Sequence, residues 1–136
     1  MAKFVLTDAS LVVNGQDLSS NCETVTVNMS QPEQDVSAMG DAGHVIVPGL
    51  PDCSFDVTWR QDYTASKVDA TNWTAYGLPT FTVVAKPTSA IVGTANPTFT
   101  GNCILTDYKP ISGAIGDAAD ATTTYTVSGT IVRATS

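Results

Sequence analysis

Hydrophobic and polar residues alternate with a period of two along most of the chain, which is the pattern of half-buried β-strands. Residues 54–60 show it most clearly, because their aromatic and aliphatic side chains share one face and their polar side chains the other. An Asn14-Gly15 pair, a strong hairpin-turn signal, joins the first strand to Asp17-Leu18. The predicted strands span residues 8–13, 24–29, 54–60, 80–85, 98–105 and 122–133.

One segment, about residues 64–76, breaks the alternation and predicts a short α-helix. Thr64 or Asp62 can cap its start, Gly77 can supply a left-handed stop, and Pro79 forbids continuation. We expect this helix to close one opening of a β-sandwich or barrel. Its expected apolar face consists of Ala65, Val68, Trp73, Ala75 and Tyr76.

Two stretches are longer than tight turns, about residues 30–50 and residues 86–97. Long loops in a compact β domain tend to be functional or flexible. Residues 43–48, inside the first stretch, can pair as an extra strand or reach for a neighbouring molecule. There is no internal repeat and no linker composition, so we expect one domain over residues 1–136.

The charge balance argues against a nucleic-acid-binding surface. The chain has 6 Lys plus Arg against 13 Asp plus Glu, a net charge of −7, whereas phosphate neutralisation needs clustered cations. Charged residues are only 14%, and 20 Thr and 11 Ser cover the surface instead. Because Thr suits pleated, half-buried surfaces, this composition supports the all-β prediction.

No segment has the pattern of an exported or membrane-bound protein. The apolar run after Lys3 is too short for a signal peptide, and Ala2 stands where myristoylation needs Gly. Residues 87–106 carry no charge, but their Pro, Gly, Asn and Thr content does not suit a membrane helix. We therefore expect synthesis in the cytoplasm and no membrane partner.

Catalytic and metal-binding patterns are missing from the sequence. The single histidine, His44, has no nucleophile motif beside it, and the three cysteines form no CxxC pair. Cys53 and Cys103 fall at the alternate strand positions that point toward the core. We therefore expect free thiols, with a disulfide as the alternative. No calcium or phosphate-binding loop is present. We expect no enzyme activity, cofactor or metal, which leaves a binding module or a structural subunit.

Several segments in order carry a family resemblance that covers nearly the whole chain. They are KFVLTDASLVVNGQDLS, DVSAMGD, QDYTASKVDATNW, KPTSAIVGTANPTFTGNCILTDYKPISGAIGD and GTIVRATS. The chain resembles the major tail (tail tube) proteins of long-tailed, siphovirus-type bacteriophages, especially those of actinobacterial hosts. The resemblance implies a β-sandwich or barrel with one flanking helix. It also implies a virion protein whose rings of six stack into a hollow tube, with tape measure and tail-terminator proteins as further partners.

The same resemblance implies where subunits meet. The loop over residues 37–50 would reach the next ring, with Met39, Ile46 and Leu50 as apolar anchors and Gly40, Asp41 and His44 nearby. Packing within the molecule is the alternative for Met39 and Leu50. The Thr-rich strands 80–85 and 122–130, poor in charge, are expected to offer open edges to neighbours in a ring. An acidic lumen would repel phosphates and let DNA slide without specific binding.

Two other classes compete with the tail tube. A phage capsid decoration protein is also small and β-rich, but binds a preformed shell, usually as a trimer. A carbohydrate-binding or adhesin β-sandwich would need export and an exposed aromatic platform.

Overall fold

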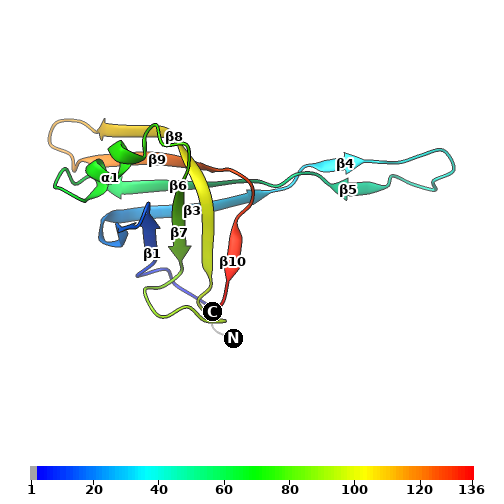
Figure 1. The fold of residues 1–136 in the computed structure, drawn as a ribbon, viewed down its shortest axis with the longest axis horizontal. Coiled ribbons are helices and arrows are strands. Elements are labelled where there is room, and N and C mark those ends of the chain that lie inside the picture. The colour runs from blue at the N-terminus through cyan, green and yellow to red at the C-terminus, as the bar shows by residue number, and fades with distance from the viewer. Residues whose placement is uncertain (1–2) are drawn as a thin grey trace.

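The computed structural model describes residues 3–136, so the Met1-Ala2 start that bears on lipidation lies outside it. The described chain is mostly antiparallel β-sheet with one short α-helix (Figure 1), which confirms the predicted fold class. In chain order the elements are β1 (Ser10–Val13), β2 (Gln16–Asp17), the 3-10 turn η1 (Ser19–Asn21), β3 (Cys22–Ser30), β4 (Glu33–Asp35), β5 (Ile46–Pro48), β6 (Asp52–Arg60), α1 (Val68–Ala75), β7 (Phe81–Lys86), β8 (Thr98–Ser112), β9 (Asp120–Val127) and β10 (Val132–Ala134).

The main sheet has the strand order β2-β1-β7-β8-β9-β6-β3, and β10 pairs with β8 beside β9. The long strand β8 belongs to both halves of this sheet. Its residues 99–103 pair with β7, and its residues 103–112 pair with β9. Figure 1 shows β8 bending between these two parts, so that β1, β7 and β10 run across the direction of β3, β6 and β9. The sheet thus folds over on itself and encloses one core, as in orthogonal β packing.

The core follows the predicted alternation. On β6, Cys53, Phe55, Val57 and Trp59 are buried, and on β9 every second residue from Ala121 to Val127 is buried. The indole nitrogen of Trp59 donates a 3.0 Å hydrogen bond to Thr123 Oγ1 across the β6–β9 pair. A buried polar atom of each strand is thereby satisfied without interrupting the apolar core.

The helix is shorter than predicted. Asp62 and Thr64 form a local turn, Ser66 has a φ of +62°, and Lys67 stands at the N-cap, so α1 begins at Val68 rather than at residue 64. Gly77, with a φ of +93°, follows the end of the helix as predicted. A positive φ interrupts a right-handed helix, which explains why the first turn of the predicted segment is not helical.

The predicted apolar face of the helix is only partly right. Val68 and Ala75 are buried in the core, together with Asn72 and Thr71, at the spacing of one helical face. Trp73 lies on the opposite face and is 68% exposed, and Tyr76 is 64% exposed. The buried Tyr125 hydroxyl donates to Asn72 Oδ1 and thereby ties the helix to β9.

Two predictions about the strands, one of length and one of position in the sheet, need correction. The run over residues 122–133 is two strands, because Gly129, with a φ of +95°, breaks it between β9 and β10.

The expectation that residues 80–85 and 122–130 offer open edges is wrong. The strand β7 pairs with β1 and β8, and β9 pairs with β8 and β6, so both are central. Among the described strands, β3 presents a long free edge instead.

The three cysteines, Cys22, Cys53 and Cys103, are free, as expected, and the last two are buried. Burial raises the pKa of the Cys103 thiol to about 12, so this side chain behaves as a small hydrophobic group.

In the second predicted loop, residues 86–97, Asn96 is buried and its side-chain nitrogen Nδ2 donates to the carbonyl oxygen of Ala90 at 2.9 Å. This loop is therefore held by internal hydrogen bonds.

Candidate assembly interface

The predicted loop over residues 30–50 is a paired β-hairpin, here called the arm and defined as residues 31–50. Strands β4 and β5 form a separate two-stranded sheet with Asp35 opposite Ile46. Figure 1 shows the arm projecting far from the main sheet, beyond the ends of β3 and β6. Of the two options that the sequence left open for residues 43–48, the extra strand is thus correct for β5.

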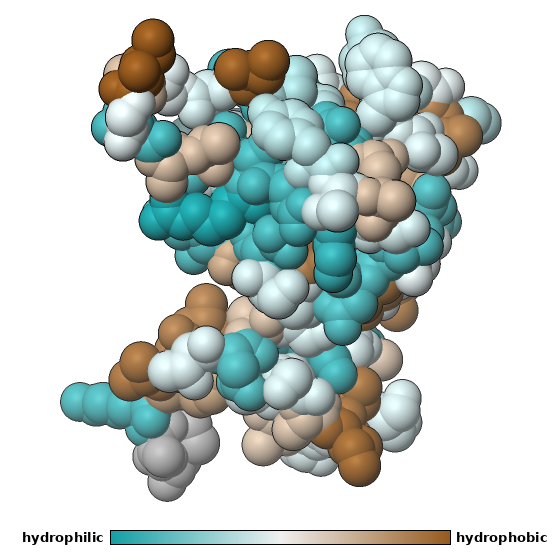
Figure 2. All heavy atoms as spheres, turned by 90° about the vertical axis from the view of Figure 1, so that its left-hand side faces the viewer, coloured by the Kyte–Doolittle hydropathy of each residue, from teal (hydrophilic) through white to brown (hydrophobic). Residues whose placement is uncertain are grey.

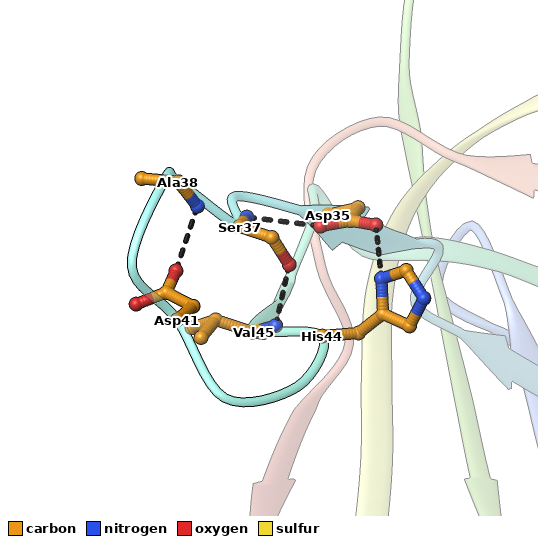
Figure 3. A network of polar contacts seen from close by, with 6 residues as sticks. All are labelled: Asp35, Ser37, Ala38, Asp41, His44 and Val45. Carbon is orange, nitrogen blue, oxygen red and sulfur yellow. Dashed lines mark hydrogen bonds and ion pairs between the residues drawn. The ribbon is translucent and has the colours of Figure 1, made fainter.

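The end of the arm is ordered by hydrogen bonds between side chains and backbone (Figure 3). Asp35 Oδ1 accepts from the Ser37 amide at 2.9 Å, and Ser37 Oγ accepts from the Val45 amide at 2.7 Å. The Val36 amide donates to the Val45 carbonyl oxygen at 2.8 Å. His44 Nδ1 lies 3.1 Å from Asp35 Oδ2. The contacts of Ser37 with Val45, Val36 with Val45 and Asp35 with His44 join the two sides of the hairpin, so His44 has a local partner.

The electrostatics of this network favour an ionised Asp35. Hydrogen bonds from the Ser37 side chain and backbone, and a smaller one from His44, hold the pKa of Asp35 below its ordinary value. At the far turn, Asp41 Oδ2 accepts from the Ala38 amide at 2.6 Å. Both carboxylates therefore fix the backbone of the hairpin end.

All six residues predicted for subunit contact lie on the arm. Met39, Gly40 and Asp41 occupy its far turn, where Gly40 has a φ of +95° that suits glycine. His44 and Ile46 lie on the returning side, and Leu50 is at the base. The alternative of packing within the molecule is wrong for Met39 and Leu50, whose side chains are 104% and 86% exposed.

The arm exposes more apolar surface than the sequence suggested. Val36, Val45 and Val47 are at least 40% exposed, and Met29, near the end of β3 and the base of the arm, is 57% exposed. The sequence contained a signal for the exposure of these three valines, because they are strand-forming residues on either side of the turn at the far end of the arm. An isolated two-stranded hairpin is marginally stable in water, and exposed apolar side chains on it favour burial against a partner.

A second candidate surface is the outer face of strands β3, β6 and β9. At its centre Asp56 accepts hydrogen bonds from Asn28 Nδ2 at 2.7 Å and Thr124 Oγ1 at 3.2 Å. At its end Arg60 pairs with Glu23 at 3.0 Å and Asp120 at 2.8 Å. Most other side chains of this face are hydroxyls or amides, so its surface is polar and carries more carboxylates than cations.

Two particular kinds of feature, a metal-binding cluster and a membrane-spanning helix, were not found in the part of the chain that the structure describes. Within residues 3–136 no three His, Cys, Asp or Glu side chains gather in a way that could hold a metal ion. No helix in the same range combines the length and the apolar character that crossing a bilayer requires.

The architecture matches solved structures from tail assemblies. The chain superposes on the SPP1 tail tube with a TM-score of 0.72 at 14% identity, covering 95% of this chain and 77% of that one. The fold is that of a tail tube subunit. No protein-family model and no curated protein matches the sequence itself.

Two further structural matches come from gene transfer agent particles. A chain of the native gene transfer agent virion gives a TM-score of 0.68 at 10% identity, covering 93% of this chain and 95% of that one. A chain from the tail of the empty particle, refined with helical and C6 symmetry, gives 0.67 at 11% identity, with 91% and 92% covered. At such low identities the likeness establishes the fold alone.

Proposed function

We propose that this protein is a structural subunit of a phage tail tube, without catalytic activity, which self-assembles into stacked rings. The observation that carries the proposal is the tail tube fold joined to an arm that exposes apolar residues outside the main sheet. A chain of this length has a radius of gyration of roughly 14 Å, so one copy cannot enclose a DNA duplex and several must form a ring. The C6 symmetry of the gene transfer agent tail favours six.

Within this proposal the arm makes the ring-to-ring contact. Met39, Ile46 and Leu50 are its apolar anchors, and Gly40, Asp41 and His44 shape the end that enters the contact. Exposed apolar side chains of this kind gain about 1.5–3 kcal/mol each on full burial. The free edge of β3, rather than the central strands that the sequence suggested, is the place for a neighbour within a ring.

We place the polar outer face of β3, β6 and β9 toward the lumen. Its excess of carboxylates and its hydroxyl groups would repel or slide past phosphates, so DNA would pass without specific binding. The tube would belong to the virion of a long-tailed, siphovirus-type phage, with an actinobacterial host as the resemblance implies. The subunit would be made in the host cytoplasm, and tape measure and tail-terminator proteins would be its partners.

The test is negative-stain electron microscopy of the purified protein at high concentration, combined with sedimentation velocity. Hollow tubes of uniform width support the proposal. A trimer that coats phage heads and never forms tubes would favour a capsid decoration protein instead.

A second candidate, carbohydrate binding, has one observation in its favour. The exposed rings of Trp73 and Tyr76 stack with centroids 6.1 Å apart and planes 15° from parallel, which gives a small aromatic platform on α1. Binding of soluble polysaccharides that Trp73→Ala abolishes, in a protein that forms no tubes, would favour this candidate.

A further inference from the structure

The end of the molecule opposite the arm carries two exposed aromatic rings on α1, here called the platform. It consists of Trp73 and Tyr76, whose ring planes are 15° from parallel and whose side chains are mostly exposed. Figure 1 shows α1 at this end of the long axis and the arm at the other. Figure 2, which faces this end, shows hydrophobic side chains along its upper edge above a polar middle. The two rings are therefore available to a ligand and stand beside polar surface.

A polar hollow adjoins the platform, between α1 and the turn that joins β1 to β2. It has a volume of about 180 Å³ and is lined by Asn14, Gln16, Ser66, Ala70, Thr71 and Thr74. Ala70 lies one helical turn before Trp73, so the hollow and the platform are neighbours on the helix surface. Asn14, Gln16, Ser66 and Thr74 are exposed, and their amide and hydroxyl groups can donate and accept hydrogen bonds.

The inner wall of the hollow holds a polar group without a partner. Thr71 is 5% exposed, and its Oγ1 makes no hydrogen bond within residues 3–136. Buried hydroxyls are nearly always satisfied by protein, water or a ligand, because leaving one unpaired destabilises the fold. A ligand hydroxyl that reaches this wall would supply the missing partner.

The charges around the hollow do not select an ionic ligand. None of the six lining residues is charged. The charged residues next to them in the chain are Asp17, Lys67 and Asp69, which do not share one sign. Asp17 accepts from the Ser19 amide at 3.0 Å, and Asp69 accepts from the Tyr108 hydroxyl at 2.8 Å. A phosphate or a nucleic acid would need clustered cations, which this end lacks.

We propose that the platform and the hollow together form a binding site for a neutral glycan. A sugar ring has an apolar face that packs on an aromatic ring and hydroxyl groups at its edge that bond to amides and hydroxyls. Pockets that enclose a drug-sized ligand measure roughly 300–1,000 Å³, so this smaller hollow suits one sugar unit. The rest of the glycan would lie over Trp73 and Tyr76.

The site is separate from the surfaces used in the proposed assembly. Tyr125 points from β9 into the core and donates to Asn72, so α1 lies on the core side of β9. Asp56 and Thr124 lie on the other side of the same sheet. With that other side toward the lumen, α1 lies away from the lumen, and the glycan site is on the outside of the tube. This placement rests on the proposed function, whereas glycan binding by the subunit does not.

The first test is isothermal titration calorimetry of the purified protein with neutral hexasaccharides of glucose, mannose, galactose or N-acetylglucosamine. At least one should bind, and Trp73→Ala and Tyr76→Ala should each weaken it by about tenfold or more. Phe4→Ala is the control, because it removes another ring that is 57% exposed, and it should bind like the wild type. No binding to any of the four, or equal binding by Trp73→Ala, would overturn the inference, as would a preference for polygalacturonate, an anionic glycan.

The hollow is tested with Thr71→Val, which removes the unpaired hydroxyl and keeps the shape of the side chain. The variant should be at least as stable as the wild type in urea, because no internal hydrogen bond is lost. Its affinity for the glycan should nevertheless fall by about tenfold. Unchanged affinity would show that the hollow takes no part in binding.

The placement is tested on assembled tubes. Tubes pelleted with a fluorescent form of the hexasaccharide that binds should retain it, and tubes of Trp73→Ala should not. Tubes that fail to bind a glycan which the free subunit binds would contradict the outside placement while the proposed function stands. Glycan binding by a protein that forms no tubes at any concentration would support the site and overturn the proposed function.

Discussion

The amide nitrogen of Gly49 donates a 2.6 Å hydrogen bond to the carbonyl oxygen of Pro32. The two residues are so close that a Cβ atom on Gly49 would lie 2.9 Å from Pro32 Cγ. The two chain segments of the arm therefore meet at its base, and residues 33–48 lie outside the main sheet. This geometry makes the arm removable without touching the core.

Replacing residues 33–48 with Asn-Gly should give a folded protein that forms no tubes. None of the residues removed is buried, so the melting temperature should change by less than about 5 °C. Circular dichroism measures the melting temperature, and electron microscopy measures assembly. Tubes that still form from this variant would show that the arm is not the contact between rings.

Gly101→Ala should destabilise the fold by about 1–3 kcal/mol, because overpacking a core forces its neighbours to move. A Cβ atom on Gly101 would lie 3.1 Å from Val127 Cγ2 and 3.2 Å from Phe55 Cε2. Urea unfolding measures the loss. Gly43→Ala is the matched control, since no atom lies within 4 Å of its added Cβ, and equal stability of the two variants would contradict the prediction.

Tyr125→Phe should cost about 1–3 kcal/mol of unfolding free energy, because it leaves the buried Asn72 Oδ1 without its donor. The exposed Tyr63 also donates its hydroxyl, to Pro110, so Tyr63→Phe is a control for which we expect a smaller loss. Chemical denaturation of both variants measures the difference. A larger loss for Tyr63→Phe would contradict the importance of the bond between β9 and the helix.

The order of the arm's end should depend on acid pH through Asp35. Its pKa is lowered from 3.8, so its stabilising contribution is present above that value and is lost as the pH falls through the lowered folded pKa. The protection factors of the Ser37 and Val45 amides, measured by NMR hydrogen exchange relative to the intrinsic rate at each pH, should therefore fall only below about pH 4. Ser37→Ala removes the largest cause of the shift and should move the titration of Asp35 upward; an unmoved titration would contradict this assignment.

Asp56→Lys should leave tube assembly intact and make the lumen retain DNA. The substitution places a cation at the centre of the face that we orient toward the lumen, where phosphates would pass. Sedimentation of assembled tubes with labelled duplex DNA measures retention, which should weaken as salt rises. Asp17→Lys makes the same charge change on β2, which lies at the opposite end of the strand order from β3, and equal retention by both variants would contradict the orientation.

Much of the fold was predictable because local patterns determine it. The alternation over residues 54–60 gives the buried face of β6, and the Asn14-Gly15 turn, with positive φ at both residues, joins β1 to β2 as expected. Gly77 ends the helical segment for the same local reason. The six candidate contact residues were named from the family resemblance, and they lie together on the arm because they belong to one stretch of chain.

The tertiary structure decided what the local pattern leaves undetermined. A period of two says which face of a strand is buried but not which strands flank it, so β7 and β9 were expected at edges and are central. Pairing between β4 and β5, and the outward position of Trp73, likewise depend on where the segments start and on what they pack against. By itself the sequence determined strands, turns and an exposed loop, because these depend on neighbouring residues. Which edge stays free, and that the arm forms a sheet of its own outside the main sheet, depend on contacts between residues distant in the chain.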